Sequence, residues 1–243
     1  MKHLLAFEFH KLLKFKSFYI CMIIMISFIF LNIFTTYQLS SSTSLWTILK
    51  AYYTHAMLLT ILSIFTSIYI CDDFTNNTMK NIYAKGYTNI QIYFAKYVTI
   101  QTVCFIYQCI SILFTLFIGS FYFSSSFITD KHFILSFGSI TFIIFVYNTI
   151  YFMISMICRK QGTSIAYSLI GPSIISLLFT LLDTLSPLKN MIHFSNYSID
   201  TILTNLTSVQ CSNSTILQAI FIGCIVMVAC LYIGLYLVSK NES

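Results

Sequence analysis

The sequence predicts an all-α integral membrane protein with six transmembrane helices. Of its 243 residues, 58% are hydrophobic and only 8% are charged, whereas a soluble domain carries about 25% charged residues. So few charges cannot cover the surface of a soluble fold of this size. Six apolar runs are each long enough to cross roughly 30 Å of hydrocarbon. They are expected to be helices because lipid offers no partners for free backbone groups.

Residues 2–16 precede the first run and predict an amphipathic helix that lies in the membrane interface. Apolar and basic side chains separate onto two sides at 100° per residue, and only Phe7 and Glu8 break this pattern. The apolar side holds Leu4, Leu5, Phe9, Leu12, Leu13 and Phe15, and the polar side holds His3, His10, Lys11 and Lys14. The alternative is a basic flank that only sets the topology.

The six apolar runs are expected to form a single transmembrane domain, 1–243, because neither an internal repeat nor a separate soluble domain is visible in the sequence. The predicted spans cover about residues 18–37, 52–71, 97–122, 133–158, 164–182 and 216–238.

The distribution of Lys and Arg predicts that both termini are cytosolic. With the N-terminus inside, ten of the thirteen Lys and Arg residues fall inside, and only Lys50, Lys131 and Lys189 fall outside. The net charge of +6 then lies mostly against the anionic inner leaflet of the lipid bilayer. It does not indicate a nucleic-acid partner, because the basic residues form no separate soluble patch. Abundant Ile, Phe, Asn, Lys and Tyr suggest an AT-rich bacterial genome, so the expected location is the bacterial plasma membrane, with multiple passes.

The stretch 72–96 between the second and third spans is polar and predicts a short helix, a sharp turn and a second helix at the cytosolic face. Asp72 and Asp73 are expected to end the second span at the membrane surface, because carboxylates are costly in hydrocarbon. Thr75, Asn76, Asn77 and Thr78 are N-cap candidates for a helix over 78–85.

The turn between these two helices is predicted from Gly86, which suits the left-handed position after a helix. Thr88 and Gln91 then have the spacing of a capping box, which starts a helix at residue 89 that runs into the third span. On the first helix, Met79, Ile82 and Tyr83 can form an apolar side that docks a cytosolic partner. The alternative is a well-capped loop without a partner.

Several of these residues resemble a motif in the membrane subunits of type-2 ABC exporters. Many of those subunits carry E-F-x-x-G-T, then a short helix and a downstream Lys; here the matching residues are Asp73-Phe74, Asn77-Thr78 and Lys96. Asp73 replaces the usual Glu, and Asn77 replaces the usual Gly. The opening AFEFHKLLKFKSFYI and the layout of the spans also look similar, most of all to bacterial peptide-antibiotic immunity and amphipathic-peptide export systems.

The resemblance implies that the loop is a coupling helix that sits in a groove of a cytosolic ABC ATPase. The implied coupling residues are Asp72, Asp73, Thr78, Met79, Ile82, Tyr83 and Gly86. Because the chain lacks a G-x-x-x-x-G-K-[ST] phosphate loop, ATP and Mg are expected on that separate subunit, and no cofactor is expected on this chain. The resemblance also implies a dimer with a second permease copy or a paralogue, and export of amphipathic or antimicrobial peptides or other hydrophobic compounds.

Small polar residues mark two of the predicted spans. They are Thr60, Ser63 and Ser67 in the second span and Ser168, Pro172 and Ser176 in the fifth. Such residues permit close helix packing, and they are also candidates to line a translocation path. Gly171-Pro172 is expected to kink the fifth helix.

The predicted extracytosolic loop, 183–215, is rich in Ser, Thr and Asn. Its apolar pairs Met191-Ile192 and Ile202-Leu203 indicate either small external helices or a re-entrant piece between the last two spans.

Enzymatic and ion-coupled functions find little support in the sequence. The five His are scattered, Glu is limited to two residues, and we find neither a catalytic constellation nor metal-ligand spacing. No charged residue is expected at mid-membrane, where proton- or ion-coupled carriers usually place one. The alternatives that stay open are an ion-coupled carrier or channel without an ATPase partner, and a membrane enzyme or scaffold.

Overall fold

The computed structural model describes residues 1–39, 56–122, 131–185, 194–207 and 213–240, which form helices and no strands. The helices are α1 (Lys2–Lys14), α2 (Lys16–Leu39), α4 (Ala56–Thr75), α5 (Thr78–Ala84), α6 (Asn89–Tyr122), α7 (Lys131–Cys158), α8 (Gln161–Leu185), the 3-10 turn η1 (Phe194–Tyr197), α9 (Ile199–Thr207) and α10 (Asn213–Lys240).

Six of these helices, α2, α4, α6, α7, α8 and α10, are long and apolar enough to cross a membrane. The predicted fold class is therefore confirmed. Helix α6 has 34 residues and is about 51 Å long, so it exceeds the roughly 30 Å hydrocarbon layer. It starts at Asn89, which confirms that the second helix of the polar loop and the third span are continuous. Residues 52–55 of the predicted second span, Lys50 and Lys189 lie outside the described residues.

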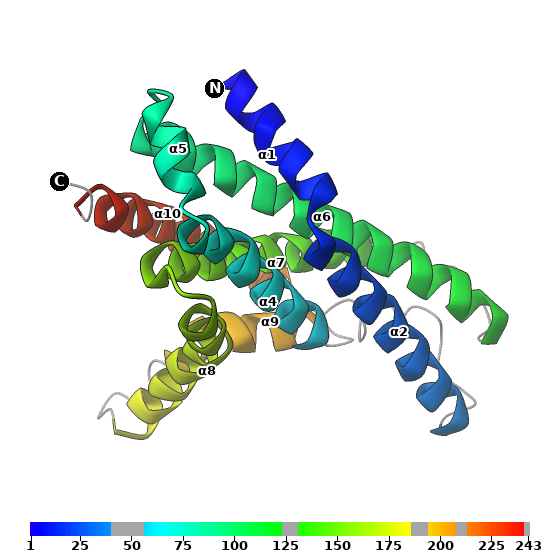
Figure 1. Ribbon diagram of the computed structural model, residues 1–243. Helices are drawn as coiled ribbons and strands as arrows, with labels where there is room; N and C mark the ends of the chain where they lie inside the picture. The colour runs from blue at the N-terminus through cyan, green and yellow to red at the C-terminus, as the bar shows by residue number, and fades with distance from the viewer. Residues whose placement is uncertain (40–55, 123–130, 186–193, 208–212, 241–243) are drawn as a thin grey trace.

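Helix α7 forms the centre of the bundle. It packs against α4, α6, α8 and α10, as Figure 1 shows, and it is the most buried of the six spans, whereas α8 is the least buried. Its buried side chains include Ile140, Ile143, Ile144 and Phe152. Four of the other five spans therefore surround α7, and α2 packs on α4 and α6.

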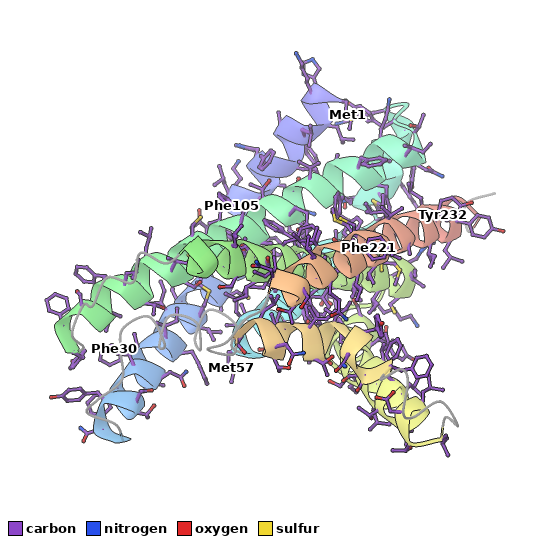
Figure 2. The ribbon with its side chains drawn as sticks, turned by 180° about the vertical axis from the view of Figure 1, so that it is seen from behind. Met1, Phe30, Met57, Phe105, Phe221 and Tyr232 are labelled. Carbon is purple, nitrogen blue, oxygen red and sulfur yellow. The ribbon has the colours of Figure 1, made fainter. Side chains whose placement is uncertain are left out.

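The outward surfaces of the spans are apolar. Figure 2 shows Phe30, Phe105, Phe221 and Tyr232 pointing away from the bundle, and between 49% and 72% of each of these side chains is exposed. A continuous apolar surface of this kind is unfavourable in water. It suits a lipid environment, as expected for a multi-pass membrane protein.

Helix α1 forms as predicted, and it packs mainly by the expected apolar side. Leu4 and Leu12 are buried, and Leu5, Phe9 and Phe15 pack against the core. Two positions differ from the expectation: Glu8 is buried, and Leu13 is 61% exposed. The helix ends at Lys14, the backbone of Phe15 is extended, and α2 begins at the next residue. The buried side of α1 is thus chosen by contacts with α6 and by the partners of Glu8, rather than by apolarity alone.

The segment between the last two spans forms small helices, as predicted. Ile202, Leu203 and Leu206 of α9 are buried against α7, α8 and α10. Asp183 near the end of α8 accepts hydrogen bonds from the backbone N–H groups of Phe194 and Ser195 at the start of η1. The pair Met191-Ile192 lies outside the described residues.

The position of α9 along α7 favours the re-entrant alternative. The Tyr147 hydroxyl donates a hydrogen bond to the Asp200 carboxylate, and Tyr147 lies halfway along the span-length part of α7, Leu135–Cys158. A carboxyl group therefore lies beside the middle of α7, and the expectation that no charged residue lies at mid-membrane stays a prediction. Asp200 comes from a segment predicted to be external, so its depth depends on how that segment folds back.

Candidate functional site

The short helix α5 is built largely as predicted. Gly86 has a φ of 83°, and its N–H donates to the Tyr83 carbonyl over 2.8 Å, so a left-handed residue ends the helix. Thr88 and Gln91 form the capping box: the Thr88 N–H donates to Gln91 Oε1 over 3.3 Å, and the Gln91 N–H donates to Thr88 Oγ1 over 3.4 Å. These bonds start α6 at Asn89.

The N-terminus of α5 is not capped by the side chain of its N-cap residue. Asn77 occupies the N-cap position with a φ of 54°, and its side chain makes no capping hydrogen bond. The hydroxyl of Thr78 instead donates to the Asp73 carboxylate over 2.5 Å. The first residue of α5 is thereby bonded to the last turn of α4.

The apolar side of α5 faces the protein's own core. Met79 and Ile82 are only 5% and 6% exposed, so these two side chains do not offer the outward docking face that was expected. Burying these apolar side chains against the core removes them from water, which is favourable whether or not a partner protein is bound. Tyr83 is half-buried, and the outward side of α5 carries Lys80, Asn81 and Lys85.

Asp73 lies in the last turn of α4 and does not end that helix. Helix α4 continues to Thr75, and Asp73 is only 2% exposed. Its carboxylate accepts hydrogen bonds from Lys96 and, over 2.5 Å, from Lys11. Because two cations and the Thr78 hydroxyl surround it, the carboxylate can stay charged away from water. Asp72 is half-buried and accepts a hydrogen bond from the Asn76 side chain over 3.0 Å.

Lys96 links Asp73 to a second carboxylate. The Lys96 side chain is fully buried, and its Nζ lies 3.1 Å from Glu8 Oε1. The Tyr69 hydroxyl donates to Glu8 Oε2 over 2.8 Å. We call the four charged residues Glu8, Lys11, Asp73 and Lys96 the charge cluster. It carries two charges of each sign and joins α1, α4 and α6, with α5 attached through Thr78.

Glu8 and Lys11 were missed as site residues, whereas Lys96 was noted only as the Lys of the motif. One signal was present in the sequence. Glu8 lies four residues from both Leu4 and Leu12, so it shares their helix face. An acid on the apolar side of a helix requires a cationic or hydrogen-bonding partner when that side is buried.

The small polar residues proposed for a translocation path lie at two different places. Ser63 and Ser67 of α4 and Ser168 of α8 are fully buried, and Ser63 Oγ lies 3.1 Å from Ser168 Oγ. Ser164 adds to this group, since its Oγ lies 2.9 Å from both Ser67 Oγ and Ser155 Oγ of α7, within hydrogen-bond distance of each. These hydroxyls therefore satisfy one another where α4, α7 and α8 meet.

The remaining path candidates, Pro172, Ser176 and Thr60, lie outside this buried group of hydroxyls. Pro172 and Ser176 border a cavity of about 30 Å³ that Tyr147 and Asp200 also line. The Thr60 hydroxyl donates to the carbonyl of Met57, one turn earlier in α4, over 2.8 Å. Lining of a path by these residues stays a prediction.

A network of hydrogen-bonded polar side chains inside the bundle was not predicted from the sequence. Thr66 of α4 donates to the side-chain oxygen of Asn148 over 3.0 Å, Asn148 donates to Gln101 of α6 over 3.2 Å, and Gln101 donates to Thr149 over 2.8 Å. These bonds tie α4, α6 and α7 together. Within the described part of the chain, no group of three or more His, Cys, Asp or Glu side chains could hold a metal ion.

Comparison with known proteins places these features in a family. The family model described as ABC-2 family transporter protein matches residues 4–174. The match includes α1 from Leu4 onward, the whole of α5 and all four residues of the charge cluster. No curated protein matches the chain.

Proposed function

The chain belongs to the ABC-2 family of transporter proteins, and on this premise we propose that it is the membrane subunit of an ATP-driven exporter. A member of this family is the membrane-spanning permease, and the family implies an ATPase on a separate subunit. In our proposal, ATP and Mg are bound on that cytosolic ATPase, and α5 carries the effect of hydrolysis to the spans. Both termini of this chain are then cytosolic, in the bacterial plasma membrane.

The observation that supports this proposal best is the bonding of α5 to three helices. Thr78 holds the Asp73 carboxylate, Asp73 pairs with Lys96 and Lys11, and Lys96 pairs with Glu8. A force on α5 therefore acts on α4, α6 and α1 together. A close-packed protein interior transmits displacement because it deforms little.

The coupling residues would divide into two roles. One group would fix α5 to the bundle, because most of its members are buried or bonded to other residues of this subunit. This group is Asp72, Asp73, Thr78, Met79 and Ile82. Gly86 would set the turn, and Tyr83 would contribute at the edge that faces the ATPase together with the exposed polar side. The surface offered to the ATPase would thus be basic rather than apolar.

A second permease subunit, identical or paralogous, completes the proposed exporter. Helix α8 is the least buried span, with Ile174, Leu178 and Leu181 about half exposed, which leaves it able to face either lipid or another subunit. The proposed cargo is an amphipathic or antimicrobial peptide or another hydrophobic compound, as in peptide immunity systems. That choice is supported by the resemblance of the opening stretch and of the span layout.

The proposal is tested by isolating the tagged chain from its native membranes. We expect an ATPase subunit with a phosphate loop to accompany it, and we expect efflux of an amphipathic peptide from cells to need ATP. The main alternative, an ion-coupled carrier, draws on the Asp200–Tyr147 hydrogen bond near mid-span. Transport that continues after ATP depletion, and stops when the ion gradient is removed, would favour that alternative.

A further inference from the structure

A second feature at the same end of the molecule lies outside the charge cluster. A cavity of about 440 Å³ opens between α5, the start of α6 and the junction of α7 with α8. Figure 1 shows α5 at the edge of the bundle, on the side where the chain begins. The cavity is lined by Phe74, Asn77, Met79, Lys80, Tyr83, Asn89 and Arg159.

Arg159, the only arginine of the sequence, lines this cavity and has unsatisfied donors. Its Nε and Nη2 atoms are buried and have no hydrogen-bond partner among the described residues. The guanidinium carbon lies 5.3 Å from the centre of the Phe74 ring, a cation–π contact that covers one face of the group. The in-plane N–H groups still need an acceptor, because buried charged donors without partners are unfavourable.

The backbone at this cavity is also unusual. Arg159 has a φ of 58° and Asn77 has a φ of 54°, and within the described residues they are the only non-glycine positions with positive φ. Glycine ordinarily takes such a position after a helix. Residues held in this region cluster at functional sites, and here both of them line one cavity.

We propose that this cavity receives a carboxylate side chain from the cytosolic ATPase, which the Arg159 guanidinium binds. This inference rests on the proposed function and names one contact within it. Arginine presents a planar fork of N–H donors that matches a carboxylate in two parallel hydrogen bonds. Phe74 and Met79 give the cavity apolar walls, so an ion pair beside them is less screened than one on a fully open surface.

Charge complementarity identifies the occupant as acidic. Lys80 lines the cavity beside Arg159, and the other outward residues of α5 add Lys85 but no acid. A protein carboxylate fits better than a lipid phosphate because α5 and the first turn of α6 form the walls. The cavity lies where α4 ends at Thr75, α7 ends at Cys158 and α6 begins at Asn89, so it opens at the ends of these spans.

The first test compares two neighbouring positive residues. Arg159→Gln removes the buried charge, whereas Lys160→Gln removes an exposed charge that does not line the cavity. We expect Arg159→Gln to lower the amount of ATPase that co-purifies from native membranes by at least about tenfold, since removing one partner of a buried charge pair mainly speeds dissociation. Lys160→Gln should lower it by less than about twofold. Membrane levels and size-exclusion profiles of both variants are measured alongside, to separate loss of binding from loss of fold.

The second test keeps the charge and locates the partner group. Arg159→Lys places an amine in the cavity, and a carbodiimide joins an amine to a carboxylate only when the two are in contact. We expect mass spectrometry to find a new cross-link from position 159 to an Asp or Glu of the ATPase. Links that involve Lys80 should appear in the wild-type chain as well, and they serve as the internal control.

The possible outcomes separate this inference from the proposed function. If the ATPase co-purifies equally with the wild type and with Arg159→Gln, and position 159 forms no link to it, the carboxylate contact is wrong and the exporter assignment stands. Loss of bound anionic phospholipid from Arg159→Gln, with the ATPase retained, would show that a lipid phosphate fills the cavity and would overturn the proposal. If the wild-type chain brings down no ATPase at all, the proposed function fails and the contact fails with it.

Discussion

At the scale of single residues, Lys96 has the most demanding environment. It is fully buried between Glu8 and Asp73, and its attraction to both carboxylates offsets the loss of hydration. Each carboxylate has a further partner: Tyr69 bonds Glu8, and Lys11 pairs with Asp73. No single member can therefore be removed without leaving an uncompensated charge.

Replacing Lys96 tests this arrangement directly. Lys96→Met should destabilise the fold by about 3–5 kcal/mol, because Glu8 and Asp73 would face each other without the central cation. Thermal unfolding in detergent measures the loss. Lys160→Met is the matched control, since that side chain is exposed and its loss should change stability by less than about 0.5 kcal/mol.

The same cluster also predicts non-additivity. Adding Glu8→Gln to Lys96→Met should recover part of the stability, because the double variant buries one charge fewer. If the two losses simply add, the Glu8–Lys96 pair is not coupled in the folded protein.

Gly86 is the second residue with a specific requirement. Its φ of 83° is unfavourable for a branched side chain, although a Cβ there would meet nothing within 4 Å. Gly86→Val should therefore cost about 1–2 kcal/mol through backbone conformation alone. Gly138→Ala in α7 is the control: a Cβ there also meets nothing within 4 Å and its φ is not positive, so stability should not fall. Equal unfolding temperatures for Gly86→Val and the wild type would contradict this account of the turn.

At the scale of elements, α5 is a helix with two different sides. Met79 and Ile82 hold it on the bundle, and Lys80, Asn81 and Lys85 face outward. A helix of seven residues has little stability of its own, so these contacts and the Thr78–Asp73 bond maintain it. The coupling role proposed for α5 depends on this attachment as much as on the outward side chains.

Tyr83 lies at the boundary of the two sides and offers a test of coupling. Tyr83→Asp puts a negative charge beside the cavity where we propose that a carboxylate binds, so it should uncouple ATP hydrolysis from export while membrane insertion stays normal. Asn81→Asp adds the same charge at an exposed position of the same helix that does not line the cavity, and it should have a smaller effect. Export and ATPase activity are measured in the same vesicles, and unchanged export by Tyr83→Asp would indicate that α5 is only a linker.

At the scale of the whole molecule, the segment between α8 and α10 meets the centre of the bundle. Asp200 of α9 reaches Tyr147 of α7, and Asp183 of α8 binds the start of η1. Movement of α7 or α8 would therefore move this segment. Such a connection suits a transporter in which the spans and the segment between α8 and α10 move together.

Two substitutions separate a structural from a proton-relay role for Asp200. Asp200→Asn keeps an acceptor for the Tyr147 hydroxyl, whereas Tyr147→Phe removes the donor. In an ATP-driven exporter, we expect Asp200→Asn to retain export within about threefold and Tyr147→Phe to cost about as much as one ordinary hydrogen bond, roughly 1 kcal/mol of stability. Abolished export in Asp200→Asn alone would support ion coupling instead.

The sequence by itself determined the class of fold, the six spans and the helix–turn–helix of the polar loop. These follow from local physics: the length of apolar runs, a left-handed glycine at Gly86 and a capping box at Thr88 and Gln91 involve only neighbouring residues. Only the tertiary structure decided the partners of Glu8, Asp73 and Lys96, the inward side of α5, the contact of Asp200 with Tyr147 and the unsatisfied donors of Arg159. Each of these depends on residues far apart in the chain, and periodicity along one helix carries no information about which other helix will face it.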